Sequence, residues 1–200
     1  MKLYYAQGAC SLAPHITAEE CGLKLDIVKV DLRVKQTEAG VDYNSVNAKG
    51  YVPALQMDDG SLLTETQVIV QYLADLRPEA GLAPKAGSVE RYRLQEWLAY
   101  IAGEIHKNVG GLFRAAPDGR EALIANANRR LEFAASALRQ QPWLMGEAFS
   151  VADIYLYVVL SWAPMLKFDL SPFPALQDFF ARVAARPAVQ QARRDEGLPA

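Results

Sequence analysis

Cys10 is the residue of this sequence whose type and position best suit nucleophilic chemistry. It follows Gly8 and Ala9 after a strand-like segment, and Pro14 limits how far upstream the next helix can begin, because proline is tolerated only in the first turn. A cysteine at a helix N-terminus meets free backbone amides and the positive end of the helix dipole, which lower its pKa and favour the nucleophilic thiolate. A buried cysteine that packs as a small apolar residue fits the same position. The residues alone leave both interpretations open.

A proline and two polar residues further along have the types needed to hold a peptide. Val52-Pro53 precedes a strand-like segment, and a cis bond there would turn the Val52 backbone outward for pairing with an extended peptide. Glu65 and Thr66 lie in the first turn of a predicted helix, where free amides can hold a carboxylate and Glu65 can accept hydrogen bonds from an ammonium group. Together these residues suit the backbone end of an amino acid. An ordinary trans proline and a Glu65 that only complements its own helix explain the same pattern.

His106 is the candidate for proton transfer. It lies one step off the apolar face of a long predicted helix, where a lone histidine is usually structural or solvated. If it pointed into a cleft, it would give or take a proton near neutral pH, and Lys107 would add positive charge for an anionic ligand. Tyr5 and Ser11 are rival hydroxyl donors near the first turn, although a strand tyrosine usually packs and a serine before a helix usually caps it.

The composition excludes several classes of function. The 200 residues include 21 basic and 23 acidic side chains spread along the chain, which argues against nucleic acid as a partner. The first residues lack the apolar core of a secretion signal, and the apolar stretch from Ile154 to Leu166 is shorter than the roughly 20 residues of a membrane helix. We therefore expect a mature protein without a membrane span.

The cysteines and histidines indicate neither a zinc site nor a disulfide. Two of each are present, without a Cys-x-x-Cys or a His-Glu-x-x-His spacing. Cys10 and Cys21 would flank one helix at a separation of about 16 Å, which is beyond disulfide reach. Two free thiols fit a reducing, cytoplasmic compartment, and no metal is expected.

Strand-like and helix-like segments alternate over the first 76 residues. Lys2 to Tyr5 and Leu25 to Asp31 read as strands, and Leu12 to Cys21 reads as a helix between them. Residues 51–57 and 61–63 flank an Asp-Asp-Gly turn and predict a hairpin. Residues 64–76 close this part as a helix, with Thr64 and Gln67 at capping-box spacing.

The chain changes character after residue 76. Residues 77–88 are rich in proline and glycine and mark a linker, and the segments beyond it favour helix: 89–114, 121–140, 150–166 and 174–185. Ser150 and Asp153 have the spacing of an acidic capping box. The sequence therefore predicts a small α/β unit of about four strands followed by an all-helical domain.

The order and spacing of these motifs resemble the beta class of bacterial glutathione S-transferases over essentially the whole chain. The segments that carry the resemblance are Met1-Lys2-Leu3-Tyr4-Tyr5, Gly8-Ala9-Cys10-Ser11-Leu12, Gly50-Tyr51-Val52-Pro53-Ala54-Leu55, Leu63-Thr64-Glu65-Thr66, Ile105-His106-Lys107 and Phe149-Ser150-Val151-Ala152-Asp153-Ile154-Tyr155. The resemblance implies a thioredoxin-like glutathione-binding domain over 1–76, a linker over 77–88, an all-helical domain over 89–200 that carries the electrophile pocket, and a homodimer.

The resemblance also assigns roles to the candidate residues. It implies a cis Val52-Pro53 bond beside the cysteinyl part of glutathione, Glu65 and Thr66 at the γ-glutamyl end, and Cys10 and His106 flanking the sulfur. The remaining glutathione-binding residues that it implies are Tyr5, Ser11, Lys35, Glu104 and Lys107, and the side chains expected around the electrophile include Phe113, Trp162 and Met165. Two positions depart from the usual pattern: Ala99, where asparagine is common, and Thr66, where serine or glycine is usual.

The function that the resemblance implies is transfer of the glutathione thiolate to small apolar electrophiles, as in detoxification, with glutathione as cosubstrate. Two alternatives remain open from the sequence. In the first, Cys10 forms a mixed disulfide with glutathione and catalyses thiol-disulfide exchange. In the second, the chain binds glutathione or a hydrophobic ligand without turnover. Ala99 favours this alternative because alanine cannot donate a side-chain hydrogen bond to the ligand.

Overall fold

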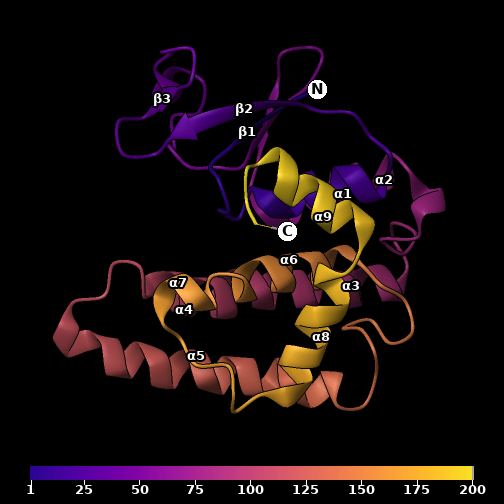
Figure 1. Cartoon of the computed structure of the whole chain (residues 1–200). Coiled ribbons are helices and arrows are strands. Elements are labelled where there is room, and N and C mark those ends of the chain that lie inside the picture. Colours follow the sequence, from indigo (N-terminus) through magenta and orange to yellow (C-terminus); the bar gives the residue numbers. More distant parts are fainter. Residues whose placement is uncertain (200) are drawn as a thin grey trace. The chain divides into compact units, whose positions relative to one another are not determined.

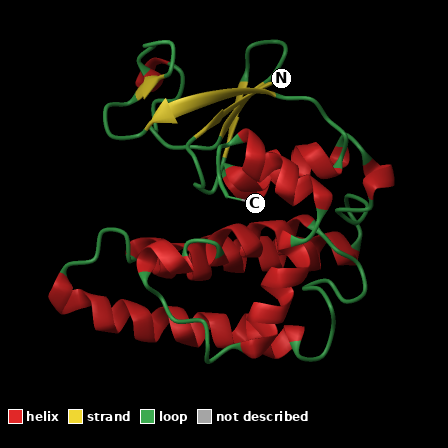
Figure 2. Ribbon diagram, in the orientation of Figure 1, coloured by secondary structure: helices red, strands yellow, loops and turns green. Residues whose placement is uncertain are grey.

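The chain folds into two compact units. The computed structural model describes residues 1–199, and internal contacts group Met1–Ala80 with the segment that begins at Pro187, and separately group Gly81–Arg186. All strands within residues 1–199 belong to the first unit, while the second unit is helical (Figure 2). The α/β and all-helical character of the two parts confirms the fold class. The domain limits at residues 76 and 88 stay a prediction, and the segment from Pro187 contacts the first unit.

A five-stranded mixed sheet forms the centre of the first unit. Its strands, in spatial order, are β3 (Gln36–Thr37), β2 (Asp26–Asp31), β1 (Lys2–Tyr5), β4 (Ala54–Gln56) and β5 (Leu62–Thr64). β1 runs parallel to β2 and antiparallel to β4, which pairs antiparallel with β5. β3 is the strand that the sequence does not predict, because two residues are too short to show an alternating pattern.

Alternating side chains of β1 point to opposite faces of this sheet. Tyr4 packs beside Tyr43 of η1 (Tyr43–Ser45), with ring centroids 5.6 Å apart, in a buried cluster with Val30 and Ala54. Leu3 is fully buried on the other face. There α1 (Leu12–Glu20) contacts both α2 (Thr66–Asp75) and α9 (Pro187–Asp195), and Figure 1 shows α9 alongside α1. A short η2 (Pro78–Ala80) follows α2.

The second unit consists of helices whose bounds are α3 (Val89–Tyr100), η3 (Ile101–His106), α4 (Lys107–Gly111), α5 (Pro117–Leu138), α6 (Val151–Leu160), α7 (Ala163–Leu166) and α8 (Pro174–Ala184). Each predicted helical segment is confirmed, with residues 150–166 divided into two helices. The helix predicted over 89–114 contains a π-helical stretch, η3, at its centre. Within residues 1–199, every helix falls short of the length and apolarity that a membrane span requires.

A capping box begins the buried helix α6, as the sequence predicts. Asp153 accepts hydrogen bonds from the Ser150 amide at 2.9 Å, the Ser150 hydroxyl at 2.8 Å and the Leu144 amide at 2.8 Å. The carboxylate is fully buried, and this burial raises its pKa to about 6, while the hydrogen bonds from Leu144 and Ser150 act in the opposite direction. Asp153 therefore joins the start of α6 to the loop that precedes it.

Candidate active site

Cys10 lies in the loop between β1 and α1, directly before the helix. Ser11 precedes the first helical residue but caps no helical amide; its hydroxyl accepts a hydrogen bond from the Ala6 amide and donates one to the Ala6 carbonyl, each at 3.2 Å. Ser11 is fully buried, so its hydroxyl fixes the loop rather than facing a ligand. The position of Cys10 at the start of a helix is thus as predicted, and Ser11 holds the loop in shape.

The Cys10 thiol is held as a neutral hydrogen-bond donor. Its Sγ donates to the Val52 carbonyl at 3.2 Å. Burial raises the pKa of Cys10 to about 11, outweighing the hydrogen bonds from the Thr66 hydroxyl and the amides of Cys10 and Ser11, which lower it. The prediction of a lowered pKa is therefore wrong for the free protein, because desolvation exceeds the effect of the helix terminus.

This raised pKa predicts the alkylation behaviour of Cys10. In a Cys21→Ala chain, which leaves Cys10 as the only thiol, the rate of reaction with iodoacetamide should rise with pH toward a midpoint of about 11, because only the thiolate reacts. The same chain unfolded in urea should titrate near the ordinary value of 9.0. A midpoint at or below neutral pH in the folded chain would show that the thiolate is stabilised instead.

The Val52-Pro53 peptide bond is cis, as the resemblance implies. The backbone on its N-terminal side is held by two side chains, since the Tyr51 carbonyl accepts hydrogen bonds from the Tyr43 hydroxyl at 2.7 Å and from Asn47 Nδ2 at 2.8 Å. Both Val52 and Pro53 are buried. The segment is thereby fixed against the sheet with the Val52 carbonyl at Cys10.

Glu65 adopts a backbone conformation that few residues other than glycine occupy. Its φ is 71°, and α2 begins at the following residue without a side-chain cap. The capping box predicted from Thr64 and Gln67 is therefore wrong. A non-glycine residue at positive φ costs about 1–3 kcal/mol and is often found where a ligand is bound. Lys49 Nζ approaches Glu65 Oε1 at 2.7 Å and Thr64 Oγ1 at 3.0 Å, so this exposed lysine orients the carboxylate.

The other candidates in the first unit, Lys35 and Tyr5, form no hydrogen bond with Cys10 among the described residues. Lys35, also at positive φ, donates from Nζ to the Gly50 carbonyl at 2.8 Å. Tyr5 is buried, and burial raises the pKa of its hydroxyl. Among the described residues, no hydrogen bond joins Tyr5 to Cys10. The first unit therefore brings together Cys10, Val52 and Thr66, with Glu65 next to them in the chain.

His106 ends the π-helical stretch of the second unit. Its Nδ1 lies 2.6 Å from the Tyr155 hydroxyl. Burial, with a smaller contribution from the neighbouring Lys107, lowers the pKa of His106 to about 4. The imidazole is therefore neutral at neutral pH, and the expectation that it titrates in that range is wrong. In the tautomer in which Tyr155 donates to Nδ1, the neutral His106 carries its proton on Nε2 and can donate one hydrogen bond.

Aromatic rings surround His106. The Trp162 ring lies 4.9 Å from it, and the exposed Phe113 packs 5.9 Å from Trp162, as measured between ring centroids. A Cβ at Gly110 would lie 3.2 Å from His106 Cδ2, so this glycine leaves room for the imidazole. Of the three side chains expected around the electrophile, Trp162 thus lies beside His106 and Phe113 beside Trp162, and both Phe113 and Met165 are exposed.

The remaining residues predicted in this unit lie on its surface. Glu104 forms an ion pair with Arg130, at 2.6 Å between Oε2 and Nε. Lys107 and Ala99 are exposed. Glu104 therefore has a protein partner for its carboxylate, while the Lys107 side chain faces solvent.

Sequence reasoning misses three residues that shape these sites. In the sequence, Tyr155 belongs only to the segment around the Ser150 capping box. Its contact with His106 joins positions 49 residues apart. Gly110 and Lys49 carry no motif of their own. Positive φ at Glu65 and the π-helical turn before His106 depend on the folded backbone, so no spacing in the sequence signals them.

Comparison with known proteins places this arrangement in a family. Family models described as the N-terminal and C-terminal domains of glutathione S-transferase match residues 8–76 and 113–187. A glutathione S-transferase of Escherichia coli O157:H7 is 46% identical over 202 residues, which cover 99% of this chain and all of the relative.

Two solved structures share the whole fold. A sphingomonad glutathione S-transferase complexed with glutathione has a TM-score of 0.95 at 44% identity, and a bacterial beta-class enzyme from Sphingomonas chungbukensis has a TM-score of 0.96 at 42% identity. Each alignment covers 100% of both chains. Identity at this level over the full length, together with both family models, shows that this chain belongs to the glutathione S-transferase family.

Proposed function

We propose that this protein transfers the sulfur of glutathione to an electrophilic carbon of small apolar substrates. The observation that carries the proposal is the Cys10 thiol, held neutral beside the Val52 carbonyl and Thr66. The glutathione thiol loses its proton to solvent, its thiolate attacks the electrophilic carbon, and the leaving group departs with the electron pair of the broken bond. Glutathione is the cosubstrate, and the complex of a similar transferase with glutathione supports this assignment.

Candidate residues of the first unit, with Glu104 and Lys107 of the second, offer groups for each part of glutathione. The cis Val52-Pro53 segment pairs with the cysteinyl backbone, and Glu65 with the amides that begin α2 receives the γ-glutamyl ammonium and carboxylate. The positive charges of Lys35 and Lys107 serve the carboxylates, and Thr66 supplies a hydroxyl. Tyr5, Ser11 and Glu104 support these groups through the packing, loop bonds and ion pair described above.

The raised pKa of Cys10 favours a role as donor over a role as nucleophile. At a pKa of about 11, only about one Cys10 in ten thousand is a thiolate at neutral pH. A neutral thiol can donate a hydrogen bond to the glutathione thiolate in place of the Val52 carbonyl. Thiol-disulfide exchange needs Cys10 as the attacking thiolate, so the same observation disfavours it.

His106 supplies the second hydrogen bond in this proposal. In this proposal Tyr155 donates to Nδ1 and the proton of the imidazole lies on Nε2, while Trp162 beside His106 and Phe113 beside Trp162 provide apolar surface for the electrophile. A neutral imidazole stabilises a thiolate through its N–H dipole without neutralising it. The sulfur then keeps its nucleophilicity.

Replacement of Cys10 tests this function. Cys10→Ala should lower kcat/KM for conjugation of a simple aryl halide by at least about 10-fold, because one hydrogen bond to a charged sulfur is worth about 1.5–3 kcal/mol. Cys10→Ser keeps a donor and should retain most of the activity. Undiminished conjugation by Cys10→Ala would remove Cys10 from the mechanism, and absence of turnover by the unmodified chain would favour the binding protein.

A mass measurement tests the alternative that uses Cys10 as a nucleophile. After incubation with oxidised glutathione at neutral pH, intact mass should show an unmodified chain, because the neutral thiol does not attack the disulfide. A stoichiometric glutathione adduct on Cys10 would instead support thiol-disulfide exchange.

We also propose that the protein acts as a homodimer in the cytoplasm. The second unit carries an aromatic cluster of Trp97, Tyr100 and Phe133, in which Phe133 is exposed and packs 5.0 Å from Tyr100. Exposed aromatic clusters are typical of protein interfaces. The two unpaired cysteines are consistent with a reducing compartment.

A further inference from the structure

A buried histidine on α1 is oriented by a carboxylate from the end of the chain. His15 is 3% exposed, and its Nδ1 lies 3.2 Å from Glu196 Oε1. Glu196 is equally buried and accepts a second hydrogen bond from the Gly8 amide at 2.9 Å. A carboxylate only accepts, so His15 carries a proton on Nδ1, and the lone pair of the neutral ring lies on Nε2.

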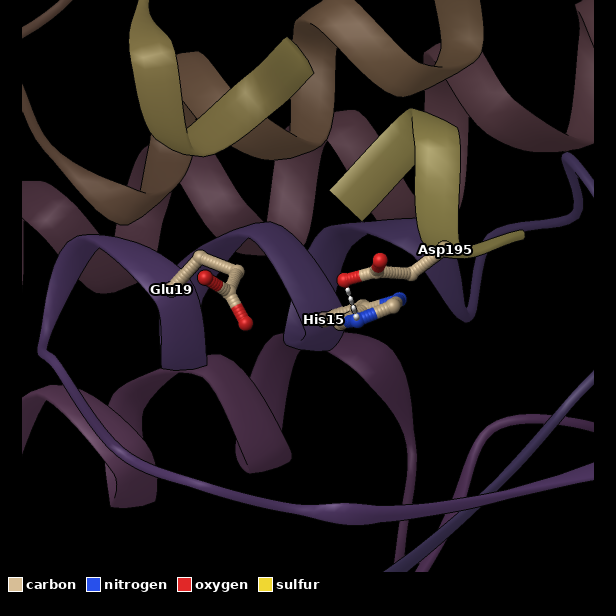
Figure 3. A group of neighbouring side chains, drawn as sticks. All are labelled: His15, Glu19 and Asp195. Carbon is tan, nitrogen blue, oxygen red and sulfur yellow. Dashed lines mark ion pairs between the residues drawn. The ribbon is translucent and has the colours of Figure 1, made fainter. Parts of the chain in front are cut away.

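The Nε2 atom of His15 faces two further carboxylates. Asp195 Oδ2 lies 4.0 Å from it, outside hydrogen-bond distance, and among the described residues no hydrogen bond reaches Nε2. Glu19 lies one turn further along α1, on the same side of the helix. His15, Glu19 and Asp195 each offer one ligand atom, and these atoms lie within 4.8 Å of one another. Figure 3 shows His15 and Glu19 on α1 and Asp195 at the end of α9.

We propose that His15, Glu19 and Asp195 form a binding site for one divalent transition metal ion, with Zn²⁺ as the best-matched ion. Imidazole nitrogen and carboxylate oxygens are ligands of zinc, and three protein ligands leave a fourth position for water. Metal-binding histidines usually donate their other ring N–H to a carboxylate, the part that Glu196 plays here. The Nε2 lone pair of His15 and the carboxylates of Glu19 and Asp195 thus have the types and positions of metal ligands.

The ligand atoms of the three side chains lie close to the separations that a zinc ion requires. Ligand atoms around tetrahedral zinc lie about 3.5 Å apart, given bonds of about 2.0–2.2 Å. The present separations of up to 4.8 Å need a contraction of roughly 1 Å. Asp195 is exposed and Glu19 half-buried, so both carboxylates can turn toward the buried, immobile His15.

The site would join the end of the chain to the loop that carries Cys10. Asp195 and Glu196 are adjacent, and Glu196 binds the Gly8 amide two residues before Cys10. An ion held between α1 and α9 would therefore stabilise the packing of α9 within the first unit. This site is separate from the proposed transfer reaction, and neither depends on the other.

Calorimetric titration with Zn²⁺ alone tests the site. It should be done on the full chain in a cysteine-free background (Cys10→Ala with Cys21→Ala), because thiols also bind zinc, and without glutathione for the same reason. One Zn²⁺ should bind per chain. Asp195→Asn and Glu19→Gln should each weaken binding by at least about tenfold, whereas Glu20→Gln, the neighbouring carboxylate on α1, should leave affinity within about twofold. Thermal unfolding gives a second readout, since excess Zn²⁺ should raise Tm in the cysteine-free chain and in its Glu20→Gln variant but not in its Asp195→Asn variant.

Three results would overturn the proposal. Absence of saturable binding in the cysteine-free chain would place any zinc affinity of the unmodified protein on its two thiols. Unchanged affinity in either Asp195→Asn or Glu19→Gln would contradict the three-residue ligand set. Equal loss in Glu20→Gln would show only a general effect of negative charge.

Discussion

His106→Phe should lower kcat/KM for glutathione conjugation by about 100-fold, the effect of removing one donor aimed at developing or existing anionic charge in an apolar site. Phenylalanine keeps the ring contact with Trp162 and removes both nitrogens. His106→Gln retains an amide donor and should recover about a tenth of the activity or more. Steady-state kinetics with glutathione and an aryl halide measure both variants.

The pH profile separates a neutral donor from a titrating acid or base. Because burial lowers the pKa of His106 to about 4, the unmodified chain should show no change in kcat/KM from His106 between about pH 5 and 8. A break near the ordinary value of 6.5 that disappears in His106→Gln would contradict the neutral imidazole. Activity of His106→Phe within threefold of the unmodified chain would remove His106 from the reaction.

Asp153→Ala should have the largest effect on stability. It leaves the amides of Leu144 and Ser150 and the Ser150 hydroxyl without their acceptor in a fully buried position. Each unsatisfied buried group costs about 1–3 kcal/mol, so the free energy of unfolding should fall by about 4 kcal/mol. Denaturant unfolding followed by circular dichroism measures the change.

An acidic residue at the start of another helix provides the matched control. Asp118 lies in the first turn of α5 and is exposed. Asp118→Ala removes only its interaction with the helix dipole, worth about 0.3–1 kcal/mol. A loss in Asp153→Ala no greater than that in Asp118→Ala would show that the buried capping box contributes little to stability.

The sequence predicts the elements whose signals are local. β1, α1 and the hairpin follow from alternation, helix periodicity and a glycine turn, and the box of Ser150 and Asp153 follows from residue types at fixed spacing. The two-residue β3 lacks any such pattern. Thr64 and Gln67 have box spacing as well, yet Glu65 at positive φ displaces the helix start by two residues. Spacing is thus reliable only where the backbone has ordinary dihedral angles.

The candidate site is less accessible to sequence reasoning. Types and order identify Cys10, Pro53, Glu65 and His106, whereas the ionisation of Cys10 and His106 depends on burial that only the folded chain determines. The helix-terminus argument for a Cys10 thiolate fails for this reason. The contacts of His106 with Tyr155 and of His15 with Glu196 span 49 and 181 positions, so no local pattern contains them.

The ionisation of bound glutathione tests the central claim most directly. Glutathione labelled with ¹³C at its cysteinyl Cβ reports by NMR whether its own sulfur is a thiolate, independent of the protein cysteines. We predict a thiolate at neutral pH in the complex with the unmodified chain, and a rise of about one unit in the pKa of the bound thiol in Cys10→Ala, equivalent to about 1.4 kcal/mol. A protonated glutathione thiol at neutral pH in the unmodified complex, or the same pKa in both chains, would contradict the account.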